Sequence, residues 1–362
     1  MIKTKICELI GIDYPILQGG MAWVATGELA AAVSESGGLG IIGSGLAPAD
    51  WLRKEIRKVK GITKKPYGVN VMLMSPFVDE VMQVILEERV PVITTGAGNP
   101  GKYVPMLKEI GTKIIPVVAS VALAKRLEKA GVDALIAEGM ESGGHIGELG
   151  TFPLVPQVVD AVDIPVIAAG GIMDGRGLMA ALALGAEGVQ MGTRFMCAAE
   201  CTISPLIKDK IIKAKDRSTV ITGRSTGHSV RCLDNHFTRE LDQYEREGMA
   251  PEELMKLGVG RLRQAMVDGD VKNGTIMAGQ IAGGVKRIEP AAHIIQDIMQ
   301  SAEREYERLT ARFGVDPETN YYGRLCEVDS ILRAGFNHKK KGKVKCPQLS
   351  VFRNPFQKEE SV

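Results

Sequence analysis

The sequence predicts an α/β protein: a (β/α)8 barrel of the TIM-barrel class with a smaller helical second domain and a C-terminal tail. Eight short, continuously apolar runs alternate with amphipathic stretches over residues 15–195. Such runs are typical of parallel strands that are covered on both faces. They begin roughly every 21–31 residues, which suits one strand, one crossover helix and two short loops. Eight repeats of this unit close a barrel.

The predicted elements alternate along the chain. The expected strands are Pro15–Gln18, Leu39–Ser44, Tyr67–Leu73, Pro91–Gly96, Lys113–Ser120, Ala134–Met140, Pro165–Gly171 and Gly188–Phe195. The expected helices are Gly27–Ser36, Asp50–Lys60, Phe77–Glu88, Val121–Ala130, Leu154–Val162 and Gly175–Leu184. A doubly wound open sheet is the alternative, since it also consists of βα units. The count of eight and the lack of a GxGxxG motif at the first helix favour the barrel.

The alternation of strand and helix stops after Phe195, and this sets the predicted domain boundaries. Residues 1–199 form the barrel, which we expect to bind the cofactor, and the charged residues 200–272 form a helical cap or insert. Residues 273–312 begin with the glycine-rich "NGTIMAGQIAGGV", expected to return to the cofactor pocket, and continue as a helix. Residues 313–362 are polar and basic, a composition typical of a tail of marginal order.

Composition and charge narrow the class of function. The chain has 362 residues, of which 45% are hydrophobic, and a formal net charge of +2. A charge this small disfavours nucleic acid as the main ligand. No run approaches the roughly 18 apolar residues of a membrane span, and the six scattered cysteines show neither a CxxC pair nor the spacing of a metal site. We expect a soluble cytoplasmic protein with reduced thiols and no metal site.

The carboxyl ends of the strands are where a barrel of this class carries its site. They read "QGGMAW", "GSG", "NVMLMSP", "TTGAGNP", "PVVAS", "EGMESGGH", "AAGGI" and "QMGTRF". Glycine, alanine and small polar residues dominate, while aspartate and lysine are nearly absent. Such a rim suits neither a proton-transfer centre nor a Schiff base. It suits a large, flat, neutral ring, because glycines let backbone N–H groups approach the ring and side-chain amides bond its polar edges.

Two neighbouring strand ends predict a phosphate site. Gly170 and Gly171 follow the core of the seventh strand, and Gly192 and Thr193 follow that of the eighth. Loops at these positions commonly bind phosphate through N–H groups and a helix N-terminus. Tight turns without a ligand are the alternative, although the same feature on two adjacent strands favours a site. A phosphate beside a flat heterocycle indicates FMN.

His145 is the candidate catalytic residue. It follows two glycines after the sixth strand, on a rim that otherwise lacks acid–base groups. There it would lie over the face of the ring and donate a proton or a hydrogen bond to a substrate oxygen. His228, in "STGHSV", is a weaker candidate that could line the same cleft.

Motifs spread over the whole barrel resemble those of a known enzyme family. They include "YPILQGGMAWVATGELAAAVSESGGLGIIGSG", "TTGAGNP", "IAEGMESGGHIG", "IPVIAAGGIMDGRG", "GAEGVQMGTRF" and "IMAGQIAGGV". Together they resemble FMN-dependent enoyl-acyl-carrier-protein reductase II, of the nitronate monooxygenase (2-nitropropane dioxygenase) superfamily. The resemblance covers roughly residues 1–310, and residues after about 312 have no counterpart in it.

The resemblance implies the residues of the site. His145 corresponds to the active-site histidine of the family, and Gln280 to the loop that closes the flavin pocket. With Gly170 from the strand ends, the expected cofactor-binding residues are Gly20, Met21, Ala22, Asn70, Glu138, Gly143, Gly170, Gly171, Gln190, Met191, Gly192, Thr193 and Gln280. Members of the family also use a monovalent cation, whose ligands the sequence does not identify.

The implied reaction is reduction of the 2,3 double bond of a trans-2-enoyl thioester, the last step of fatty-acid elongation, with NADH or NADPH as the reductant of FMN. Oxidation of alkyl nitronates with O2 is the alternative. Nitronate monooxygenases tend to have Gln where this chain has Glu138, so "EGMESGGH" favours the reductase. A non-redox barrel would need Lys or paired carboxylates at the strand ends, which are lacking. A non-catalytic flavin-binding protein is a further alternative.

The implied partner is acyl carrier protein with its enoyl chain, and a homodimer is the default assembly. Acyl carrier protein is acidic, so two basic clusters are candidates for meeting it: residues 53–58 and residues 208–215. Charged runs on helices are more often solvated faces. We expect neither a nucleic acid nor a membrane as a partner.

Overall fold

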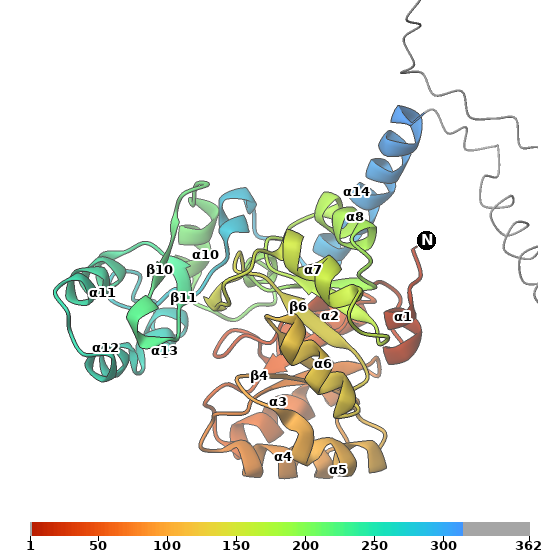
Figure 1. Cartoon of the computed structure of the whole chain (residues 1–362), viewed down its shortest axis with the longest axis horizontal. Coiled ribbons are helices and arrows are strands. Elements are labelled where there is room, and N and C mark those ends of the chain that lie inside the picture. The colour runs from red at the N-terminus through yellow and green to blue at the C-terminus, as the bar shows by residue number, and fades with distance from the viewer. Residues whose placement is uncertain (1, 314–362) are drawn as a thin grey trace, which may run out of the picture. The chain divides into compact units, whose positions relative to one another are not determined.

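The computed structural model describes residues 2–313 and contains a barrel of eight parallel strands (Figure 1). The barrel strands are β1 (Ile16–Gln18), β2 (Gly40–Gly43), β3 (Tyr67–Met72), β4 (Val92–Gly96), β5 (Lys113–Val118), β6 (Leu135–Glu138), β8 (Val166–Ala169) and β9 (Gly188–Met191). They pair in the order β1-β9-β8-β6-β5-β4-β3-β2. All eight predicted strands are therefore present, each somewhat shorter than expected.

The two outer strands of this order, β1 and β2, meet and close the barrel. Leu17 forms a parallel bridge with Leu39, the residue before β2, and the Gln18 N–H donates to the Leu39 carbonyl at 2.9 Å. The Gln18 side chain continues the pairing, because its amide donates to the Ile41 carbonyl and accepts from the Ile41 N–H, both at 3.1 Å. The closed circle confirms the predicted barrel and excludes the open sheet.

Helices cover the outside of the barrel, and one further helix packs on the end where the strands begin. The covering helices are α2 (Gly27–Glu35), α3 (Ala49–Ile62), α4 (Val78–Glu87), η1 (Pro100–Tyr103), α5 (Val104–Glu109), α6 (Val121–Lys129), α7 (Thr151–Val159), α8 (Gly175–Ala183) and the short α9 (Thr193–Met196). The six predicted helices agree with these within three residues at each end. The N-terminal α1 (Lys5–Ile10) places Ile6 among the interior side chains Leu17, Ile115 and Ile167. The barrel is thus packed and is not a pore.

The segment after α9 corrects one prediction. It contains α10 (Pro205–Ile212), β10 (Thr219–Thr222), η2 (Arg224–Thr226), β11 (Val230–Leu233), α11 (His236–Arg246), α12 (Pro251–Gly258), α13 (Arg261–Met266), η3 (Gln280–Gly284) and α14 (Ala291–Arg312). Residues 200–272 were expected to be helical, but β10 and β11 form an antiparallel sheet with β7 (Gly144–His145). In Figure 1, β10, β11 and α11–α13 gather away from α3–α5. The sequence did not predict β10 and β11, because a four-residue strand in a charged segment is too short for the alternation of apolar and polar residues to be recognised.

Residues Met1–Glu307 form one compact unit. The predicted boundaries at residues 199, 272 and 312 stay predictions, and the tail predicted from residue 313 lies, apart from Phe313, outside the described residues. Within residues 2–313, every helix is too short or too polar to span a bilayer.

Candidate functional site

The inner face of the barrel changes from apolar to polar toward the carboxyl ends of the strands. Side chains of alternate residues point inward, and the deeper ones belong to an apolar cluster that includes Ile136 on β6 and Val92 on β4. Two residues further along each strand, the same face carries Glu138 and Thr94. Asn70 on β3 belongs to this layer as well, because its amide donates to the Thr94 hydroxyl at 2.9 Å. The mouth of the barrel is therefore lined with polar side chains above an apolar floor.

The loop after β1 lies directly against this polar layer. A Cβ on Gly20 would stand 2.1 Å from the Cβ of Asn70, so only glycine fits there. A Cβ on Gly192 would lie 3.3 Å from the Met21 sulfur, and one on Gly45 would lie 2.5 Å from the Ala22 Cβ. The structure thus brings the predicted residues of strands one, three and eight together at one end of the barrel.

The ends of β8 and β9 expose backbone donors. Gly170 and Gly171 adopt positive φ angles of 93° and 73°, a conformation that favours glycine. Among residues 2–313, the N–H groups of Gly171 and Gly192 donate to no protein acceptor. Gln190 on β9 is buried beside Gly19, where a Cβ would lie 3.2 Å from the Gln190 side chain. Unpaired N–H groups on adjacent strand ends are suited to an anion.

The segment around Gln280 returns to the barrel and packs on the loop after β6. A Cβ on Gly143 would lie 2.6–2.7 Å from the backbone of Ala278 and Gly279. The Gly279 N–H donates to the Thr193 hydroxyl at 2.8 Å, and the Gln280 N–H donates to the Glu141 carbonyl at 2.9 Å. This segment therefore joins the predicted residues after strand six to those after strand eight.

His145 lies on β7, held by the cap. Its ring keeps an exposed surface, although protein fills most of the space around it, and β11 pairs with its backbone. The nearest ring is that of His228, with the centroids 6.5 Å apart and the planes at 85°. Loss of solvent around the ring, together with the neighbouring His228, lowers the pKa of His145 below its ordinary value of 6.5. The sequence proposed His228 only weakly, because nothing in it shows that β11 pairs with the GGH segment.

Glu138 is a titratable group within the polar layer. It ends β6, and its Cα partner on β8 is Ala169. Burial raises the pKa of its carboxyl to about 7, with a small opposing effect from the Ser142 hydroxyl. At neutral pH the group is therefore poised between the acid, which donates a hydrogen bond, and the carboxylate, which accepts one.

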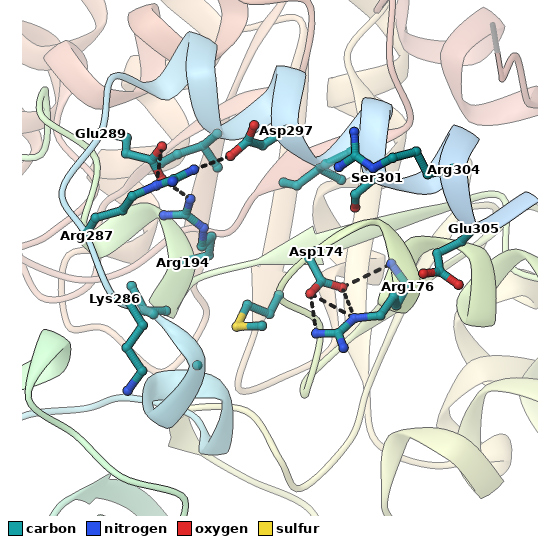
Figure 2. A pocket seen from close by; sticks show the side chains of 15 residues that line it. Asp174, Arg176, Arg194, Lys286, Arg287, Glu289, Asp297, Ser301, Arg304 and Glu305 are labelled. Atoms are coloured by element: carbon teal, nitrogen blue, oxygen red, sulfur yellow. Dashed lines mark hydrogen bonds and ion pairs between the residues drawn. The ribbon is translucent and has the colours of Figure 1, made fainter. Parts of the chain in front are cut away.

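A cavity of about 660 Å³ lies between the start of α8, residues 284–289 and α14 (Figure 2). Its arginines face carboxylates: Arg176 contacts Asp174 at 2.6 Å, and Arg287 contacts Glu289 at 2.7 Å. None of the predicted site residues lines it. A smaller cavity of about 340 Å³ is lined by several residues that include Gly170, Gly171, Gln280 and Glu141, and it reaches the predicted phosphate loops.

The two basic clusters expected to meet an acidic partner differ in how far they are engaged within the chain. Arg53 and Arg57 on α3 both contact Glu88, at 3.4 and 3.1 Å, and Arg53 also contacts Glu87 at 2.6 Å. In the second cluster, Lys208 is buried and donates to the Ala198 carbonyl at 2.7 Å. The arginines of the first cluster are therefore paired within the chain, whereas in the second cluster only Lys208 is shown to be engaged.

The residues at the mouth fit FMN. Gly20 and Gly192 are positions where a side chain would intrude, so the backbone stays open to a flat ring. The Asn70 and Gln190 amides can bond the polar edge of a heterocycle, and the unpaired N–H groups of Gly171 and Gly192 can bond a phosphate. This combination suits a phosphorylated flavin better than it suits the site of a non-redox barrel enzyme, which would need a lysine or paired carboxylates.

Comparisons with known proteins agree on one enzyme family. Residues 3–82 and 75–301 match nitronate monooxygenase. A probable nitronate monooxygenase of Staphylococcus aureus (strain JH9) is 40% identical, over 67% of this chain and 81% of the relative. The structure of FabK from Thermotoga maritima is 53% identical with a TM-score of 0.84, covering 86% of this chain and 100% of that chain. A nitroalkane oxidase from Streptomyces ansochromogenes is 30% identical with a TM-score of 0.75, covering 84% and 99%.

Proposed function

Because the chain belongs to the nitronate monooxygenase family, we propose that it is an FMN-dependent enoyl-acyl-carrier-protein reductase of that family. The reaction would combine a trans-2-enoyl thioester, NADH or NADPH and one proton, and would yield the saturated thioester and the oxidised nicotinamide. The closer likeness is to FabK, an enoyl-acyl-carrier-protein reductase, at 53% identity against 30% for the nitroalkane oxidase. Glu138 in "EGMESGGH" supports the same choice.

The observation that carries this proposal is the place of His145. It stands on β7, in the loop segment that follows β6, and Glu138 at the end of β6 is a titratable group of the polar layer. FMN, held by these residues, would supply the hydride-transfer chemistry that links the nicotinamide to the β-carbon of the enoyl thioester. Negative charge then collects on the thioester oxygen. His145, neutral at pH 7 because its pKa is lowered, would stabilise that oxygen with an N–H donor.

Other residues of the chain would hold and orient the flavin. The Asn70 and Gln190 amides would fix the edge of the flavin, and the N–H groups of Gly171 and Gly192 would hold its phosphate. The segment around Gln280, tied to Thr193 and Glu141 by backbone hydrogen bonds, would cover the pocket.

The remaining parts of the proposal concern partners and location. Acyl carrier protein stays the proposed carrier of the substrate, a homodimer the proposed assembly, and a monovalent cation a proposed cofactor. The four cysteines within residues 2–313, namely Cys7, Cys197, Cys201 and Cys232, are free and buried, which supports the proposal of a reducing, cytoplasmic location.

The visible spectrum of the purified protein under anaerobic conditions tests this function. We expect a flavin absorption that bleaches with NADH or NADPH and recovers when crotonyl-CoA is added. Flavin that ignores both nicotinamides but bleaches with an alkyl nitronate would overturn the reductase in favour of nitronate oxidation. A protein that takes up no FMN would overturn the cofactor assignment itself.

A further inference from the structure

A second imidazole reaches the site from the cap. β10 and β11 form a hairpin, and β11 pairs with β7 so that Val230 stands opposite His145. The Ile146 N–H donates to the Ser229 carbonyl at 3.0 Å, which extends this pairing. The register brings the rings of His145 and His228 into an edge-to-face arrangement, with centroids 6.5 Å apart.

Hydrogen bonds hold the tip of this hairpin next to His228. The Thr226 hydroxyl donates to the Gly223 carbonyl at 2.7 Å and accepts from the His228 N–H at 3.1 Å. The Ser225 hydroxyl donates to a carboxylate oxygen of Glu245 on α11 at 2.7 Å, and the Ser225 N–H donates to the same oxygen. These contacts hold the backbone at the hairpin tip, from which the His228 side chain extends.

Charged side chains on the neighbouring elements are engaged with other groups. The Arg231 guanidinium on β11 donates to the Met140 carbonyl at 2.9 Å and to Thr219 on β10 at 3.2 Å. The Glu141 carboxylate, in the loop before β7, accepts from the N–H and the hydroxyl of Thr151. His228 is the titratable side chain whose charge acts on His145.

We propose that His228 is a positioning residue that acts through His145. Its edge-to-face contact holds the plane of the His145 imidazole over the barrel mouth. A positive charge on His228 also opposes a proton on His145, and with the loss of solvent around the ring this lowers the pKa of His145. His145 thus presents a neutral ring with a fixed N–H direction to its substrate. The consequence for turnover rests on the proposed function, whereas the coupling between the two rings does not.

Three variants of the FMN-loaded protein test this inference. His228→Ala removes both contact and charge, His228→Phe keeps an aromatic edge but removes the charge, and His236→Gln is the matched control on α11, where the ring is half exposed beside Glu240. We expect His228→Ala to lower kcat with crotonyl-CoA by about 10-fold or more, because a displaced catalytic group is costly. His228→Phe should retain more turnover than His228→Ala, and His236→Gln should match the parent.

The pKa of His145, followed by NMR of its imidazole, gives a readout independent of turnover. We expect it to rise toward 6.5 in both His228 variants and to stay unchanged in His236→Gln, with FMN binding and melting temperature preserved in all three. An unchanged His145 pKa in the His228 variants would overturn the inference. A raised pKa in a protein that reduces no enoyl thioester would sustain the coupling and overturn only the proposed function.

Discussion

At the scale of single residues, the surroundings of His145 decide what this side chain can do. Its lowered pKa makes it a neutral donor at pH 7, and its exposed surface leaves it open to a substrate. We expect His145→Ala to bind FMN normally and to lose ~10²–10⁴-fold in turnover of enoyl thioesters, the usual contribution of such a group. Steady-state kinetics with a flavin content determined from the spectrum will check this. Full turnover in the flavin-loaded variant would remove His145 from the reaction.

The Glu138 carboxyl predicts a pH dependence of stability. Its pKa is about 7 in the folded chain and 4.5 ordinarily, so the folded state binds its proton more tightly. This contribution is fully present below about pH 4.5 and is lost as pH rises through 7. Glu138→Gln should therefore be more stable than the parent at pH 8, by about 1–3 kcal/mol, with a smaller difference at pH 5. Urea denaturation of the FMN-free proteins at both pH values measures this. Equal differences at the two pH values would contradict the prediction.

At the scale of elements, the loop after β1 depends on glycine for its closeness to β3. Gly20→Ala would place a methyl group 2.1 Å from the Cβ of Asn70 and push the loop or the amide from the site. We expect FMN affinity to fall by about tenfold or more, because a site displaced by 1 Å loses most of its complementarity. Fluorescence titration of the FMN-free protein with FMN measures this.

A matched substitution separates this clash from a general effect of alanine. Gly61 lies within α3, and apart from its chain neighbours and the backbone of its own helix no atom lies within 4 Å of a Cβ built on it. Gly61→Ala should leave FMN affinity unchanged and raise the free energy of unfolding by up to about 1 kcal/mol, since alanine favours helix. If both variants bind FMN like the parent, the loop after β1 does not shape the flavin site.

The regular elements of the barrel could be predicted because each carries its own signal. Eight buried strands read as continuous apolar runs, and amphipathic helices separate them, so the closed sheet follows from the count. β10 and β11 gave no such signal. "TVIT" and "VRCL" are short, and β11 is stabilised by pairing with β7, a partner far away in the sequence. A pairing of this kind depends on tertiary structure and leaves no local pattern.

The candidate site could be predicted in part for the same reason. Its glycines and amides stand at the ends of predictable strands, so their meeting at one end of the barrel follows from the fold. The contact of His145 with His228 follows from the missed hairpin, and no spacing in the sequence shows it. Likewise, Arg53 and Arg57 on α3 are paired with Glu88, which directly follows α4 and lies about 30 residues further along the chain.

At the scale of the whole molecule, the barrel is one closed circle, and the Gln18 side chain acts as part of its backbone pairing. The Gln18 amide is buried and satisfies both the N–H and the carbonyl of Ile41 at the junction of β1 and β2. Gln18→Ala would leave two buried backbone groups without a partner where the circle closes. Each such group costs about 1–3 kcal/mol, so we expect the free energy of unfolding to fall by about 2–5 kcal/mol.

Gln83→Ala on the exposed face of α4 is the control. It loses only a contact with Glu87 and should change the free energy of unfolding by less than about 0.5 kcal/mol. Urea denaturation followed by circular dichroism measures both variants. We expect only the Gln18 variant to lose stability, and to unfold in a single cooperative transition, because its side chain helps to close the barrel. Equal losses of stability in the two variants would show that the closure depends on backbone pairing alone.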